Sequence, residues 1–477
     1  MNKALLAVAG VVAAGGIYYV ATQGPTSGSG DMSLPSLSKS ELSTLIQSQK
    51  ASYKTDGFNI TEKDGVFSLT AKDEKKVRAF LFNKLTAMLP KSYSSSLQPL
   101  KQEFLASDQK IVAGLEFDMK VIDSKEGAKL EVVLTKLPTH LQKKLERDTK
   151  AQWFKELIDK GAFAYTLSMD KTGKVNGLAI KDIVEHIELP KTIIDTKLEG
   201  AWAKFSGDVN GKFKMQEAIK MISFNVKENN NFFGITVNNV KGNLDQTTLF
   251  DQTASSSIER IMFDMEKRNK FIKFLMNGVA FSSNTEDDNG FINSNLTMDT
   301  DKVDFKVTRK GEVKSSVILD GFKLSVTGKH ISKEAALALQ NVSTGLNPQK
   351  DLGKLQKALE KMVKTGLTLD VDALNVKKLA FGSPFLAFEV KDFTFNLHAQ
   401  LKENSLDMNM GSPAQYIPFI KITARLALNN ADLDKLVAMQ PMAGMVTSMK
   451  VVEGELAVFN IVFEAGQIKV NGKPLPF

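Results

Sequence analysis

The sequence predicts a mainly β protein with a few helices, an α+β fold built around a long antiparallel sheet. Two observations support this prediction. First, apolar residues alternate with polar ones in run after run, as in Leu115–Val121 and Phe393–Leu397, and such alternation is typical of strands with one buried and one solvated face. Second, turn dipeptides such as Asp64-Gly65 and Asn289-Gly290 separate several of these runs, which indicates a succession of hairpins.

Residues 1–22 are predicted to form an N-terminal transmembrane signal anchor. Lys3 is followed by an uncharged, proline-free apolar run from Ala4 to Ala21. At 1.5 Å per residue this run reaches roughly 27 Å, close to the ~30 Å hydrocarbon core of a bilayer. The pair Tyr18-Tyr19 lies where an interfacial aromatic belt is expected. Cleavage of a secretory signal near Ala21 is the alternative interpretation.

The charges around this run predict the orientation of the chain. Lys3 precedes the run and no charge follows it until Asp31, so the positive-inside rule places the N-terminus in the cytoplasm and the remainder outside it. Residues 23–37 are rich in Gly, Ser and Pro and are predicted to be a flexible linker. Residues 38–477 then form the β-rich domain. The chain has no cysteine, which excludes disulfides, thiolate metal sites and a lipid-modified N-terminal cysteine.

Several helices are expected to interrupt the strands. Ser38 and Glu41 form a capping box at the start of a short helix. Amphipathic spacing predicts further helices at 75–89, 139–160, 332–346, 351–364 and 432–449. The segment 258–276 fits either periodicity, and we interpret it as strands because Ile261, Phe263 and Met265 alternate.

The other alternating segments and turn signals extend along most of the chain. The segments are 163–169, 222–226, 233–237, 303–307, 322–326 and 393–397, and the further dipeptides are Asp56-Gly57, Asn176-Gly177, Asn210-Gly211, Asp320-Gly321 and Asn471-Gly472. Together they predict a long meandering sheet, although no strict sequence repeat is visible.

Composition and motifs argue against several function classes. The formal net charge is +8, but the lysines are spread along the chain between acidic residues. This pattern predicts a solvated basic surface that tolerates anionic lipid headgroups, and no nucleic-acid interface. His140, His186, His330 and His398 are far apart and lack metal-ligand spacing. We therefore predict no catalytic residues, no metal, no cofactor and no enzymatic activity.

Two apolar features are candidates for ligand binding. The chain has 30 Phe against two Trp and six Tyr, and many Phe occupy alternating strand positions. A second covering layer would make them ordinary core, whereas a single sheet layer would leave an open trough for acyl chains. A methionine stripe in the last predicted helix is either gap-filling core or an adaptable apolar surface. The candidate residues are Phe393, Phe395, Leu397, Met439, Met442, Met445 and Met449.

The C-terminal residues 366–477 resemble a known family. The segments that carry the resemblance are Gly366–Leu374, Phe393–Leu397, Ala424–Leu428 with Ala431-Asp432-Leu433, and the ending Phe463–Leu475. They resemble the YdgA-like bacterial proteins of unknown function, which are similar to AsmA-type proteins. The anchor, the linker and the hairpin at 57–69 match the layout of that family.

This resemblance implies a single-pass inner-membrane protein with its bulk in the periplasm and a long, curved, AsmA-like antiparallel sheet. It also implies handling of phospholipid or maintenance of the cell envelope. Two hypotheses follow. In the first, the apolar sheet face shelters a phospholipid or another apolar ligand. In the second, the protein is a periplasmic scaffold with a fully packed sheet that binds envelope proteins through strand edges or helices.

Overall fold

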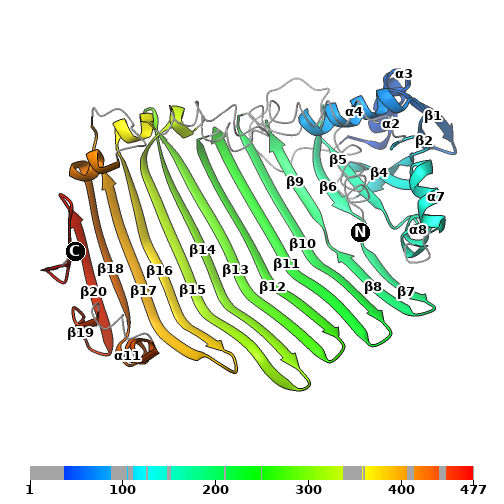
Figure 1. The fold of residues 1–477 in the computed structure, drawn as a ribbon. Helices are drawn as coiled ribbons and strands as arrows, with labels where there is room; N and C mark the ends of the chain where they lie inside the picture. The colour runs from blue at the N-terminus through cyan, green and yellow to red at the C-terminus, as the bar shows by residue number, and fades with distance from the viewer. Residues whose placement is uncertain are drawn as a thin grey trace. The chain divides into compact units, whose positions relative to one another are not determined.

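The computed structural model describes residues 37–87, 105, 111–124, 127–147, 152–208, 211–248, 250–336, 357, 360–404, 413–439 and 447–475. The chain divides into two compact units. The N-terminal unit contains the described residues of 1–187 and 195–221. The long-strand unit contains those of 188–194, 222–343 and 347–477. Both are built mainly from antiparallel strands (Figure 1).

The N-terminal unit is a sheet of short strands with helices packed against it. Antiparallel ladders join its strands in the order β1, β2, β3, β4, β5, β6, β9 and β10. The strands are β1 (Phe58–Lys63), β2 (Val66–Ala71), β3 (Glu116–Ser124), β4 (Gly127–Lys136), β5 (Ala164–Met169), β6 (Val175–Ile180), β9 (Trp202–Gly207) and β10 (Phe213–Glu228). The helices are α2 (Lys39–Ser48), α3 (Lys50–Thr55), α4 (Glu74–Ala87), α7 (Thr139–Arg147) and α8 (Gln152–Asp159).

The core of this unit lies between one sheet face and the helices. Alternate residues of the strands point inward, as Phe117, Met119 and Val121 do in β3. They pack in one cluster with Leu42 of α2 and Val77 of α4, and these two side chains are fully buried. The alternation that the sequence predicts therefore lies against a second layer here.

The long-strand unit is a single antiparallel sheet with strands of up to 21 residues. Ladders join β11 to β18 in chain order, then β18 to β20, β20 to β19 and β21, and β21 to β22. The strands are β11 (Asn231–Thr248), β12 (Asp251–Lys267), β13 (Lys270–Asp288), β14 (Phe291–Arg309), β15 (Glu312–Ser332), β16 (Leu367–Gly382), β17 (Ala387–Leu401), β18 (Ile420–Asn429), β19 (Val451–Glu453), β20 (Leu456–Glu464), β21 (Gln467–Val470) and β22 (Lys473–Pro474).

The remaining elements are short. A 3₁₀ helix, η1 (Pro413–Phe419), precedes β18, and α11 (Asn430–Met439) follows it. Strands β7 (Ile183–Leu189) and β8 (Thr192–Glu199) each contribute residues to both units, and so does β10, whose residues from Ile222 onward belong to the long-strand unit. The structure thus confirms a mainly β fold with a long antiparallel open sheet and few helices.

The helix predictions are confirmed in part. Ser38 caps α2 with the predicted capping box, and 258–276 forms strands β12 and β13. Over the predicted helix 139–160 the structure has α7 at Thr139–Arg147 and α8 at Gln152–Asp159, and residues 148–151 between them lie outside the described residues. Of the pair predicted at 332–346 and 351–364, only 333–336, 357 and 360–364 are described, and all of these are helical. Most of the predicted pair lies outside the described residues.

Some of the predicted turns lie elsewhere. Asp64-Gly65, Asn289-Gly290 and Asn471-Gly472 do join consecutive strands, as predicted. The predictions for Asn176-Gly177 and Asp320-Gly321 are wrong, because both dipeptides lie inside strands, β6 and β15. Asp56-Gly57 separates α3 from β1, where Gly57 has the left-handed conformation common after a helix. Asn210 lies outside the described residues.

The predicted anchor and linker also lie mostly outside the described residues. Leu37 is the first described residue, and it is buried and hydrogen-bonded to the backbone of Met169 and Ala128. None of the helices in the described ranges is long and apolar enough to span a bilayer.

Candidate functional site

A row of left-handed residues crosses the long-strand unit. Asn239, Gly278, Gly321 and Asp392 have φ of +49°, +63°, +60° and +53°, and they lie in β11, β13, β15 and β17. The ladders on both sides of each residue place all four on one line across the sheet. The intervening strands β12, β14 and β16 contribute Glu259, Asp301 and Lys377 to the same line, so the left-handed conformation recurs in every second strand. The long strands change direction part-way along their length (Figure 1).

Two features require glycine at positions 278 and 321 of this row: the left-handed backbone and the close approach of a side chain from the next strand. A Cβ on Gly278 would lie 2.0 Å from Oδ2 of Asp301, and a Cβ on Gly321 would lie 2.6 Å from Cδ of Lys377. The side chains of the intervening strands therefore occupy the space above the glycines. This explains why the Asp320-Gly321 dipeptide serves as a mid-strand bend and not as a hairpin turn.

The row changes which positions of each strand are apolar. A single left-handed residue inside a strand shifts the alternation of side chains by one position, as happens in a β-bulge. Apart from Phe232 next to the turn, the apolar residues of β11 are accordingly odd-numbered up to Val237 and even-numbered from Val240 onward. Val390 and Phe393 flank Asp392 in the same way, and both belong to one hydrophobic cluster. One apolar face therefore continues across the row.

We call this surface the apolar face. Between the row and the hairpin turns of β12–β13, β14–β15 and β16–β17, it contains Phe233, Ile235, Val237, Ile261, Phe263, Met265, Ile272, Phe274, Met276, Val303, Phe305, Val307, Val317, Leu319, Leu379, Phe381, Phe388 and Val390. Beyond the row it contains Val240, Leu244, Ile258, Val279, Phe281, Leu296, Met298, Phe322, Leu324, Val326, Leu369, Val371, Leu374, Val376, Phe393, Phe395, Leu397, Leu426, Phe459 and Ile461.

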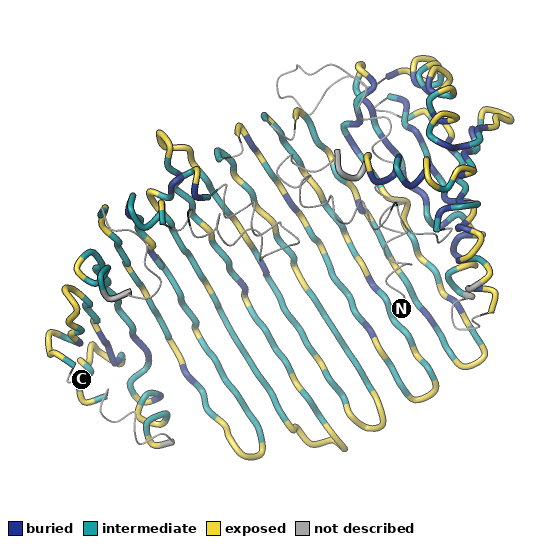
Figure 2. The backbone as a smooth tube through the Cα atoms, turned by 45° about the horizontal axis from the view of Figure 1, so that its top comes forward, coloured by how far each residue is buried: buried dark blue, intermediate teal, exposed yellow. Residues whose placement is uncertain are grey.

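Most of these side chains are neither buried nor fully exposed. The strands of the long-strand unit have intermediate accessibility along most of their length, with few buried positions (Figure 2). Phe281 and Leu296 retain 38% and 47% of their accessible surface. Lateral contacts between strands, such as the edge-to-face pair of Phe233 and Phe263 at 5.5 Å, supply the partial burial. The described residues therefore leave much of this face open to solvent.

One end of the apolar face is covered. Leu433 and Leu436 of α11 pack with Met449 against a cluster that contains Val390, Leu428 and Phe459. Asp432 fixes this helix, because its carboxylate accepts a hydrogen bond of 3.1 Å from the backbone N–H of Lys391. At this end the sheet is thus a conventional two-layer core.

The predicted site residues divide between these two environments. Phe393, Phe395 and Leu397 all lie on the apolar face, with Phe393 in the covered cluster. Met449 also packs in that cluster. Met439 is the last residue of α11, and its side chain is not described. Met442 and Met445 lie outside the described residues, so the methionine stripe stays a prediction.

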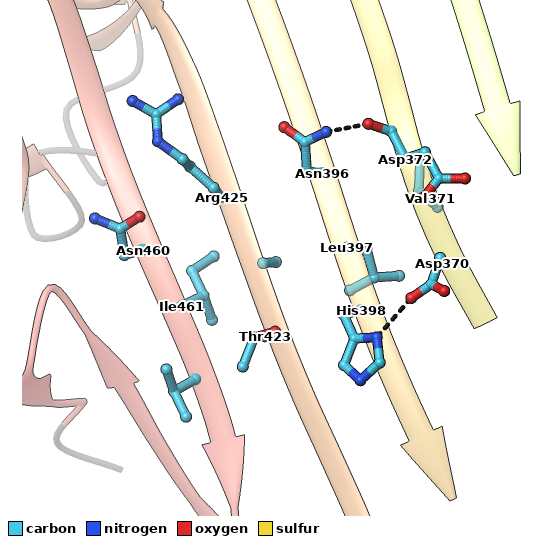
Figure 3. Close-up of a pocket in the computed structure, with 12 residues that line it drawn as sticks. Asp370, Val371, Asp372, Asn396, Leu397, His398, Thr423, Arg425, Asn460 and Ile461 are labelled. Carbon is cyan, nitrogen blue, oxygen red and sulfur yellow. Dashed lines mark hydrogen bonds and ion pairs between the residues drawn. The ribbon is translucent and has the colours of Figure 1, made fainter. Parts of the chain in front are cut away.

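The opposite face of the sheet is mostly polar. Its side chains form cross-strand pairs, such as Asn295 with Thr327 at 2.9 Å and Lys378 with Glu389 at 2.8 Å. A hollow of about 420 Å³ lies on this face across β16, β17, β18 and β20 (Figure 3). Asp370, Asn396, His398 and Arg425 contribute side chains to it.

Asp370 and His398 form the main polar contact in this hollow. Nδ1 of His398 lies 2.5 Å from Oδ1 of Asp370, and Nζ of Lys329 lies 3.1 Å from Oδ2 (Figure 3 draws the His398 contact). Burial acts to raise the pKa of Asp370, but the hydrogen bonds from His398 and Lys329 outweigh it, and the pKa is lowered. Thr423 is the partner of His398 in the ladder between β17 and β18, but no hydrogen bond joins the two side chains in the described part of the chain. The contact with Asp370 therefore orients the imidazole of His398.

Sequence reasoning missed the extent of the apolar face. It identified single alternating segments, but not that the alternation shifts by one position within each long strand. The signal was present, because Asn239, Gly278 and Gly321 each lie at such a shift. The pairing of His398 with Asp370 had no local signal, since the two residues are on different strands.

Comparisons with family models, curated proteins and solved structures find no match to this chain. The resemblance to YdgA-like proteins therefore stays a prediction. Among the described residues, no group of three or more His, Asp or Glu is arranged to hold a metal ion.

Proposed function

We propose that this protein binds long apolar molecules, such as phospholipid acyl chains, along the apolar face of its long-strand unit. The observation that supports the proposal is the half-exposed state of this face from β11 to β17. A contiguous apolar surface of this extent on a soluble sheet typically marks a ligand or interaction site. The predicted N-terminal anchor would hold the protein at the inner membrane, with the bulk of the chain in the periplasm.

The dimensions and energetics suit an acyl chain. Six inter-strand spacings of about 4.8 Å separate β11 from β17, which gives a face about 29 Å wide. This width is comparable to the ~30 Å hydrocarbon core of a bilayer, which two opposed lipid tails fill. Each methylene removed from water contributes about 0.8 kcal/mol when fully buried. A chain lying on an open face gains part of that amount at each carbon, so no specific polar contact is needed.

The alternative, a scaffold that binds envelope proteins, predicted a fully packed sheet. Among the described residues of the long-strand unit, only the end under α11 has that character. The open part of the face favours the ligand-binding hypothesis. The resemblance to AsmA-type proteins points in the same direction.

Native mass spectrometry of the full chain, extracted gently from membranes, tests the proposal. We expect bound lipid on the unmodified protein. Phe305 lies mid-face between Phe274 and Val317 in the two ladders, so Phe305→Glu should release the lipid by placing a charge beneath it. Lys306→Glu is the matched control, because the neighbouring side chain is exposed and lies on the polar face.

The proposal fails if the unmodified protein carries no lipid, or if both substitutions reduce lipid binding equally. Thermal unfolding of the two variants separates loss of binding from loss of fold. A single dominant protein partner after crosslinking in cells, with no bound lipid, would favour the scaffold.

A further inference from the structure

Hairpin turns lie along one edge of the long-strand unit, the lower edge in Figure 1, and four of them join consecutive strands from β10 to β17. Because the strands are antiparallel and consecutive, the turns β10–β11, β12–β13, β14–β15 and β16–β17 all occur at this edge. Two of them are in direct contact, since the N–H of Lys310 donates a 3.0 Å hydrogen bond to the carbonyl of Asn269. We define the rim as residues 267–270, 309–311 and 383–386.

The rim has five exposed basic side chains: Lys267, Arg268, Lys270, Arg309 and Lys310. None of them takes part in an ion pair with any residue that the structure describes. Some lysines elsewhere on the sheet are paired, as Lys314 is with Glu312 at 2.6 Å and Lys378 with Glu389 at 2.8 Å, whereas Lys241, Lys306 and Lys323 form no ion pair with a described residue. Two acidic residues directly flank these rim segments: Glu312, which is engaged by Lys314, and Glu266, which precedes Lys267.

One turn at the opposite edge is preceded by acidic residues, of which Asp287 is paired with Lys333. The β13–β14 turn follows Glu286, Asp287 and Asp288, and it uses the common Asn289-Gly290 sequence. The rim turns instead place Arg268 and Lys310 in the left-handed region, with φ of +49° and +52°. That conformation costs a long side chain about 1–2 kcal/mol. Arg268 and Lys310 thus occupy these turns at a conformational cost, which is typical of functional positions.

The third turn of the rim presents an apolar tip. Phe385 is 98% exposed and Leu386 is 44% exposed. The turn is held by Ser383, whose N–H donates to the carbonyl of Leu386 at 2.8 Å and whose Oγ accepts from the N–H of Leu386 at 3.0 Å. An ordered turn therefore holds a phenyl ring in water beside a set of free cations.

We propose that the rim is a docking surface for an anionic phospholipid bilayer. Phe385 and Leu386 enter the headgroup–acyl boundary, and the basic side chains contact the phosphates. Basic residues combined with an apolar tip are the pattern of interfacial membrane binding. A nucleic acid or an acidic protein would satisfy the charges, but would leave the Phe385 tip without an apolar partner.

The rim also lies at the end of the apolar face. Phe381 and Phe388 stack at 5.7 Å just behind the Phe385 turn, so a lipid tail leaving a docked bilayer would meet apolar side chains at once. The inference adds a membrane contact to the proposed function and does not depend on it, because docking at the rim needs no bound lipid on the face.

Flotation of the full chain with vesicles tests the inference. The protein is first reconstituted in phosphatidylcholine nanodiscs, which accommodate its N-terminal apolar segment. Vesicles of phosphatidylcholine alone, or mixed with phosphatidylglycerol, are then added. We expect flotation only with the anionic vesicles, and we expect it to weaken with salt.

Charge reversal provides the matched comparison. The triple variant Lys267→Glu/Lys270→Glu/Lys310→Glu should lower the apparent affinity by about a hundredfold or more, since each of the three basic side chains near an anionic surface contributes about fivefold. The control is Lys241→Glu/Lys306→Glu/Lys323→Glu, which has the same net charge and changes exposed lysines away from the rim. It should keep most of its binding. Equal losses in the two variants would overturn the inference, because net charge alone would then explain binding.

Phe385→Trp reports on the apolar tip. We expect its added fluorescence to shift to shorter wavelength with anionic vesicles and to be quenched by brominated acyl chains. Vesicle binding without either change would overturn the insertion of this turn. Binding to a polyanion such as heparin without binding to vesicles would overturn the membrane assignment. Native mass spectrometry of the unmodified protein keeps the two proposals apart, since bound lipid together with no flotation on anionic vesicles refutes only the rim.

Discussion

The two units use the same strand pattern to build different surfaces. In the N-terminal unit, the alternating apolar residues of β2–β5 lie under helices, and Leu130 and Leu167 retain 1% and 0% of their accessible surface. In the long-strand unit, equally apolar positions such as Phe305 and Leu324 stay partly open. Burial in the first unit is contributed by a second layer, and in the second unit largely by neighbouring strands. Alternation therefore identifies the apolar face of a sheet, but not whether anything covers it.

The largest effect is expected from a direct comparison of the buried core of the N-terminal unit with the apolar face of the long-strand unit. Leu167→Ala in the N-terminal unit should lower the free energy of unfolding by about 2–5 kcal/mol, because it leaves a cavity in a closed core. Leu296→Ala in the long-strand unit should cost about 1 kcal/mol or less, since much of the Leu296 side chain is already in water. Hydrogen-exchange mass spectrometry can measure the loss of protection in each unit separately. Equal losses at the two sites would mean that the apolar face is covered.

A smaller loss in the free energy of unfolding is expected from substitutions in the row of left-handed residues. This row lies in the long-strand unit alone, so the loss should be confined to that unit. Gly278→Ala should cost about 1–2 kcal/mol for the left-handed backbone, and more for the contact with Asp301. Gly290→Ala is the control, since its φ is +95° but no atom lies within 4 Å of a Cβ there.

The double variant Gly278→Ala/Asp301→Ala should recover part of this loss, because it removes the carboxylate from the contact. Exchange should increase in the long-strand unit alone. If the double variant recovered no stability, a steric contact between Asp301 and a Cβ at position 278 would be ruled out as the cause of the loss.

The smallest expected effect concerns the polar face. Because the pKa of Asp370 is lower in the folded protein than its ordinary value of 3.8, its contribution to stability is present above that value. The contribution is lost as the pH falls through 3.8 toward the lower native pKa. Asp370→Asn should therefore remove part of the acid sensitivity of the long-strand unit, as measured by urea unfolding at a series of pH values.

Lys329→Met should have a partial effect of the same sign, because Lys329 supplies one of the two hydrogen bonds that lower this pKa. An acid profile that is unchanged in Asp370→Asn would rule out the His398–Asp370–Lys329 contact as a source of stability.

The sequence predicted the strand content and several turns because both depend on local chemistry. The capping box at Ser38 and the turn at Asn289-Gly290 are examples. Asp320-Gly321 was misassigned for a physical reason. A glycine that permits a left-handed backbone serves a hairpin turn and a mid-strand bend equally well, and only the approach of Lys377 from the next strand distinguishes them. Likewise, the openness of the face around Phe395 depends on which segments pack over it, and no alternation pattern contains that information.

The recurrence of the left-handed residue in every second strand gives the long sheet a two-strand period. Each hairpin carries one bend and one matching side chain, so a whole hairpin could be duplicated or deleted without changing the pairing of its neighbours. A single added strand would instead place two bends against each other. The addition or loss of whole hairpins would therefore change the width of this sheet in steps of about 9.6 Å, the width of two strands.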